Sequence, residues 1–135
     1  MLLPLPSSAA QTVALSNHLT FAACRAGAGS AYLFNELIQL VYVTFFVQDA
    51  EYGETDVMVY ARAEAALERG LERAEIERVW ALDLADLPWF EAVLQEADRQ
   101  LAAAPRYVHV GARERLKRFA TSGRASPLSS AVSHH

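Results

Sequence analysis

The longest apolar segment of the chain, residues 30–48, predicts a helix that other parts of the protein cover on nearly every side. Between residues 31 and 47 it has only four polar positions: Asn35, Glu36, Gln39 and Thr44. Ser30 suits the N-cap position, because its hydroxyl can accept a hydrogen bond from a free backbone N–H of the first turn. The second half, Leu40–Val47, is apolar almost all round. It therefore belongs either to the core of the domain or to the interface of a dimer.

A membrane-spanning helix is excluded at this segment by its length. The charge-free run comprises residues 37–48, which as a helix would extend about 18 Å against ~30 Å of hydrocarbon in a bilayer. A buried strand over residues 41–47 is an alternative, because valine and aromatic residues favour β-structure. The helix is preferred, since the apolar pattern extends from Ala31 and is longer than an ordinary strand.

Apolar positions elsewhere recur at helical spacing and predict four or five further helices. We expect these from Ser7 or Ser8 to about Gly27, from Thr55 or Asp56 to Arg69, over residues 72–82, from Asp86 to Pro105, and over Ala112–Thr121. Gly70 is expected to end the third helix, and residues 106–110 could be extended. Residues 122–135 have too few apolar side chains to fold and are predicted to be a disordered tail. The predicted fold class is all-α: a compact bundle of five to six helices in one domain, residues 1–121.

Composition supports a single globular domain. The chain has 135 residues, 53% hydrophobic and 21% charged, which is ordinary for a folded protein. Its one cysteine, Cys24, excludes an intrachain disulfide and fits a reducing compartment. The start, MLLPLPSS, lacks the basic residues and the apolar run of a secretory signal. We expect a cytoplasmic protein, and the preference for arginine and alanine suggests a bacterial source.

Charge is unevenly distributed along the chain. Residues 51–104 carry a net −8 and residues 105–135 a net +5, so the basic end could fold back on the acidic body or meet an acidic partner. The last predicted helix offers a contact for an anion or nucleic acid: Arg113, Arg115, Lys117 and Arg118. No aromatic side chain lies between these charges to stack on bases. A solvated helix end, which cations stabilise, is the simpler interpretation.

One spacing pattern, over residues 66–79, resembles a helix-turn-helix hairpin. A small residue, Ala66, is followed by a turn glycine, Gly70, and then by apolar residues at 71, 76 and 79. The second helix of the hairpin would also carry three glutamates at positions 72, 75 and 77, which DNA phosphates repel. A nucleic-acid-binding regulator that uses this hairpin or the arginine-rich last helix is therefore the second hypothesis for function.

Residues with the spacing of a catalytic, metal or cofactor site are not found. The four histidines, at positions 18, 109, 134 and 135, lack the i,i+4 spacing of a helical zinc site. Ser16 and His18 point to different sides of a helix, and Cys24 near a helix C-terminus meets a dipole that disfavours the thiolate. We name no catalytic, metal or cofactor residue. An enzyme or a carrier of an apolar ligand is the third hypothesis.

The surplus of large aromatic side chains favours protein–protein contact. We select four of them as interface residues: Tyr42, Phe45, Phe46 and Trp89. The alternative is that all of them fill one core. The first hypothesis is a small regulatory, adaptor or inhibitor protein of the bacterial cytoplasm. It would act as a homodimer and bind another protein, with no membrane contact and no cofactor. The sequence does not identify the partner.

Overall fold

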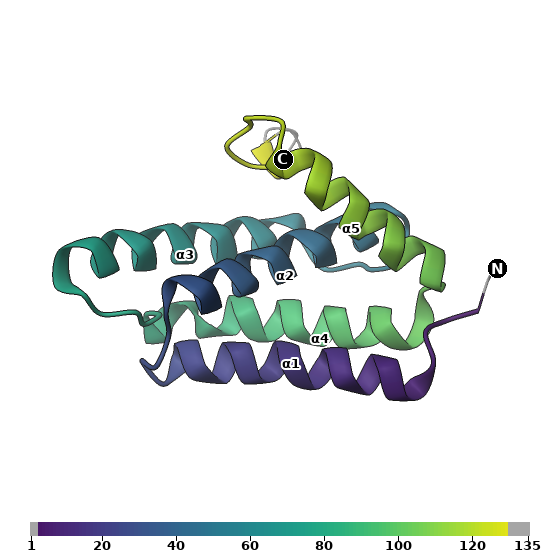
Figure 1. Ribbon diagram of the computed structural model, residues 1–135, viewed down its shortest axis with the longest axis horizontal. Helices are drawn as coiled ribbons and strands as arrows, with labels where there is room; N and C mark the ends of the chain where they lie inside the picture. The colour runs from purple at the N-terminus through teal and green to yellow at the C-terminus, as the bar shows by residue number, and fades with distance from the viewer. Residues whose placement is uncertain (1–2, 130–135) are drawn as a thin grey trace.

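The computed structural model describes residues 3–129 and contains five α-helices and one short 3-10 helix over that range (Figure 1). Their bounds are α1 Ser7–Arg25, α2 Ala31–Asp49, α3 Val57–Glu77, η1 Leu84–Asp86, α4 Leu87–Ala103 and α5 Arg106–Ala120. This part of the chain has no β-strand; its β-pairing is limited to an isolated bridge between Pro4 and Pro105. The prediction of a compact all-α bundle is confirmed.

The helices form two layers with α5 across one end. In Figure 1, α1 and α4 run side by side below, α2 and α3 lie above them, and α5 crosses the C-terminal half of α2 obliquely. Helix α2 contacts each of the four other α-helices, so the prediction of a central apolar helix is confirmed. Its N-cap is also as expected, since the Ser30 hydroxyl accepts a hydrogen bond from the Leu33 N–H at 3.1 Å.

The core lies along α2. Its buried side chains come from every turn of that helix and include Phe34, Leu37, Val41, Phe45, Phe46 and Val47. Each large apolar side chain that is fully buried contributes about 1.5–3 kcal/mol relative to an exposed one. The longest apolar segment of the sequence thus forms the centre of the bundle.

Helix α3 corrects the prediction of a break at Gly70. The helix continues through Gly70 to Glu77, so the hairpin over residues 66–79 and the separate helix over 72–82 do not exist. Gly70 is a packing residue: a Cβ at this position would lie 2.6 Å from Cε2 of Phe34. The glycine therefore permits α2 and α3 to approach closely. The helix ends where Arg78 adopts a left-handed φ of 61°.

Helix α5 begins at Arg106, so the suggestion of extended backbone over residues 106–110 is wrong. Pro105 directly precedes the helix with φ −61°, a position at which its missing N–H costs nothing. Val108 and Ala112 are buried one turn apart. The spacing of these two buried residues is the i,i+4 spacing of a helix and not the alternation of a strand.

The chain after α5 packs on the bundle as far as it is described. Leu128 is only 1% exposed, and the Ser126 hydroxyl donates a hydrogen bond to Glu64 of α3 at 2.6 Å. The prediction of a disordered tail from Ser122 is therefore wrong for residues 122–129, because one apolar side chain and one hydrogen bond hold this segment. Residues 130–135 lie outside the described part of the chain.

Candidate functional site

Two of the predicted interface residues, Phe45 and Phe46, belong to the core of a single chain. They are 6% and 3% exposed. The Phe45 ring packs edge-on against Tyr60 of α3 at 5.7 Å, and the guanidinium of Arg115 lies 4.3 Å from the centre of the Phe46 ring. Helices α3 and α5 thus already cover the rings that were expected to need a second copy.

The other two predicted interface residues are partly buried and have partners within the chain. The Tyr42 hydroxyl donates a hydrogen bond to Glu64 at 2.5 Å, and its ring meets Phe119 edge-on at 5.8 Å. Burial and the adjacent Glu64 carboxylate raise the pKa of Tyr42. Trp89 lies beneath the guanidinium of Arg62, 4.7 Å from the ring centre. Neither ring is a freely exposed aromatic anchor.

The four basic residues predicted for an anion contact are all exposed on α5 but differ in their surroundings. Arg115 pairs with Asp49 of α2 at 2.7 Å, and Lys117 lies 3.7 Å from Glu114. Within residues 3–129, neither Arg113 nor Arg118 pairs with a carboxylate. Arg113 lines a pocket between four helices, and the other three basic residues do not line that pocket.

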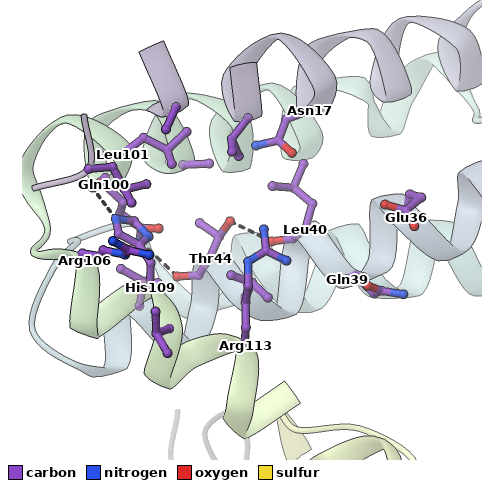
Figure 2. A pocket seen from close by; sticks show the side chains of 17 residues that line it. Asn17, Glu36, Gln39, Leu40, Thr44, Gln100, Leu101, Arg106, His109 and Arg113 are labelled. Atoms are coloured by element: carbon purple, nitrogen blue, oxygen red, sulfur yellow. Dashed lines mark hydrogen bonds between the residues drawn. The ribbon is translucent and has the colours of Figure 1, made fainter. Parts of the chain in front are cut away.

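That pocket lies between α1, α2, α4 and α5 and has a volume of about 270 Å³ (Figure 2). Its apolar lining comes from the leading segment and all four helices: Leu5, Ala9, Val13, Leu40, Val43, Val47, Ala97, Leu101 and Val110. Its polar lining comprises Asn17, Glu36, Gln39, Thr44, Gln100, Arg106, His109 and Arg113. A cavity that combines apolar walls with grouped polar side chains is typical of a small-molecule site.

One wall of the pocket is held by hydrogen bonds between helices. The buried Gln100 side chain of α4 donates to the Thr44 carbonyl of α2 at 3.0 Å. His109 Nε2 of α5 lies 3.1 Å from the Gln100 carbonyl, and because a carbonyl only accepts, this nitrogen carries the hydrogen. Burial lowers the pKa of His109, and the charge of Arg113 acts in the same direction. The imidazole therefore favours its neutral form.

The pocket carries a net positive lining. Arg106 and Arg113 lie two turns apart on α5, and no carboxylate within residues 3–129 pairs with either guanidinium. Among the lining residues, Glu36 supplies the single carboxylate. Figure 2 shows Arg106 and His109 at one end, Arg113 reaching up from α5 in the middle, and Glu36 at the far end.

The four residues predicted for an anion contact include Arg113, but they do not include the other basic residues of this pocket, Arg106 and His109. The reason is the misplaced start of the last helix at Ala112, which left both residues in a presumed extended segment. If the segment is read as helix, positions 106, 109, 110 and 113 share one face. That spacing could have placed Arg106 and His109 beside Arg113 from the sequence alone.

Other reactive side chains do not form a catalytic group. His18 Nε2 lies 2.9 Å from Asp98 Oδ2, so this histidine links α1 to α4 by a hydrogen bond. The Cys24 thiol is buried, and burial raises its pKa to about 11, so thiolate is scarce at neutral pH. No group of three or more His, Cys, Asp and Glu side chains in the described chain is placed to hold a metal ion.

The outer face of α1 is a second surface of interest. Before Arg25, α1 has no Asp, Glu, Lys or Arg, although the chain as a whole is 21% charged. Leu15 and Leu19 are each 60% exposed on this face. Together with Leu33 of α2 they line a shallow groove whose other members are Thr12, Ser16 and Thr20. We call these six residues the α1 face.

None of the helices within residues 3–129 is both long and apolar enough to cross a membrane. Comparison with protein families, with curated proteins and with solved structures finds no match to this chain.

Proposed function

We propose that this protein acts by protein–protein contact through the α1 face, and that a second copy of the chain binds there. The observation that carries the proposal is the exposure of Leu15 and Leu19 on a helix without charged side chains before Arg25. The cores of protein interfaces are depleted in charge, and exposed apolar patches commonly mark them.

A second copy fits the α1 face because the face is neutral and complementary to itself. Leu15 and Leu19 stand one helical turn apart, and the flanking side chains at positions 12, 16 and 20 are small. Two such helices can approach closely, so the leucines of one copy fill the groove of the other. No like charges meet across this contact.

A small helical dimer of this kind suits a regulator, adaptor or inhibitor of another protein in a bacterial cytoplasm. The nucleic-acid alternative loses one of its two elements, because residues 66–77 belong to one continuous helix. Its other element, the basic side of α5, has Arg115 and Lys117 adjacent to carboxylates, which weakens their attraction for phosphate.

Light scattering over a range of concentrations tests the proposal. We expect the wild type to run as a dimer and Leu15→Glu/Leu19→Glu to run as a folded monomer. Ile76→Glu is the matched control, because Ile76 is 82% exposed on α3 outside the α1 face, and it should stay dimeric. A wild type that is monomeric at every concentration, or a double variant that still dimerises, overturns the proposal.

A further inference from the structure

The pocket beneath α5 lies apart from the α1 face, so the proposed protein contact does not occupy it. It involves the inner side of α1, including Val13 and Asn17, whereas the exposed leucines of the α1 face line a separate groove. Any ligand of this pocket is therefore independent of the proposed dimer.

We infer that the pocket binds an apolar monocarboxylate, with the carboxylate on the α5 side, where Arg106 and Arg113 supply positive charge, and the apolar chain between α1 and α2. Both guanidinium groups come from α5, and within residues 3–129 neither pairs with a carboxylate of the protein. A guanidinium can donate two parallel hydrogen bonds to a carboxylate, which gives both strength and orientation.

The apolar lining indicates that the part of the ligand beyond the carboxylate is apolar. Side chains of Val13 from α1, Val43 from α2 and Leu101 from α4 enclose the space that the arginines face. A small hydrophilic anion would leave this surface in contact with water, whereas an aliphatic chain removes it from water.

The volume limits the length of that chain. At about 270 Å³ the pocket is slightly smaller than the ~300–1,000 Å³ of ordinary ligand sites. It suits a chain of medium length and not a long fatty acid. Octanoate is the probe that we choose on this basis.

Glu36 favours one orientation of a bound ligand. It lies at the end of the pocket away from Arg106 in Figure 2, so a ligand with a second carboxylate at its far end would meet a like charge. Octanedioate should therefore bind more weakly than octanoate. His109 supports the same wall through the Gln100 carbonyl, 3.1 Å from its Nε2.

Isothermal titration calorimetry on the full chain tests the inference with octanoate, octanol, acetate and octanedioate. We expect octanoate to bind best, with octanol lacking the charge, acetate lacking the chain and octanedioate repelled at Glu36. Octanol binding as tightly as octanoate would show that the arginines are not used. Acetate binding as tightly would show that the apolar lining is not used. Either result overturns the inference.

Substitutions of lining residues test whether octanoate binds in this pocket. Arg113→Gln and Arg106→Gln should each weaken octanoate binding about tenfold or more, as expected for loss of a charged hydrogen bond. Arg118→Gln is the matched control on the same helix, since Arg118 does not line the pocket, and it should bind like the wild type. Val110→Phe, at a half-exposed lining position, should fill the space and reduce binding without changing charge. Unaltered binding in Arg113→Gln and Val110→Phe, with both variants folded, would contradict the inference.

Discussion

The carboxylate of Glu96 on α4 accepts two hydrogen bonds from Thr55, one from its backbone N–H at 3.1 Å and one from its hydroxyl at 2.9 Å. The same carboxylate accepts the Glu54 N–H at 2.8 Å and the Arg99 Nε–H at 3.1 Å. Burial pushes the pKa of Glu96 upward, but these donors outweigh burial and hold the pKa below its ordinary value. Glu96 therefore fixes the segment that leads into α3.

Replacing Glu96 by alanine should destabilise the fold by about 2–3 kcal/mol, because the Thr55 and Glu54 donors then lose a buried acceptor. The measurement is chemical denaturation followed by circular dichroism. Glu91→Ala, at an exposed position of the same helix, is the control and should change the free energy of unfolding by less than about 0.5 kcal/mol. Equal effects of the two substitutions would contradict the structural role of Glu96.

His109 should make stability depend on pH in mildly acidic solution. Its pKa in the folded protein is lowered from 6.5 by burial, with Arg113 contributing, so the unfolded chain takes up the proton first as pH falls. The stabilisation is present above about pH 6.5 and is lost as pH drops toward the lower folded pKa.

Denaturation curves between pH 8 and pH 5 test this expectation. His109→Gln should show a smaller decline in the free energy of unfolding than the wild type below about pH 6.5. The measurement at pH 8, where a histidine of lowered pKa is neutral, is the reference for both proteins. If the free energy of unfolding of His109→Gln falls as much as that of the wild type, a group other than His109 causes the pH dependence.

Two glycines within helices should respond oppositely to alanine. At Gly70 a Cβ would lie 2.6 Å from the buried Phe34 ring, so Gly70→Ala should destabilise by about 1–3 kcal/mol through overpacking. At Gly111 of α5 nothing lies within 4 Å, so Gly111→Ala should stabilise by about 0.5–1 kcal/mol through helix propensity. Thermal unfolding of the pair measures both signs, and a stabilising Gly70→Ala would show that α2 and α3 are not packed as described.

Leu128 should anchor the segment after α5. Leu128→Ala removes a side chain that is almost fully buried and should cost about 2 kcal/mol, near the lower limit for a buried leucine because the segment can readjust. Proteases should also cleave residues 121–129 faster in this variant. Leu84→Ala, at an exposed leucine, should change neither property. Cleavage at the wild-type rate in Leu128→Ala would show that Leu128 does not hold the segment.

Local sequence was sufficient for the elements whose signals lie within a few residues of one another. The apolar run of α2, the hydroxyl of Ser30 at its start and the stripe of α4 around Phe90 and Val93 each predict a helix without reference to the rest of the chain. The all-α class follows from those periodicities. Local spacing also identified Arg113, although not its place in a pocket.

The remaining features depend on contacts between residues distant in sequence, which periodicity does not encode. Gly70 has the local signature of a turn, but its close approach to Phe34 makes it part of a continuous helix. Leu128 alone could not indicate a folded tail, because its burial depends on the bundle that it meets. The pocket combines side chains from four helices. The sequence by itself determined which segments are helical and which helix is central. The tertiary structure decided which apolar rings are core and where the cations face a cavity, because burial is set by packing across the whole chain.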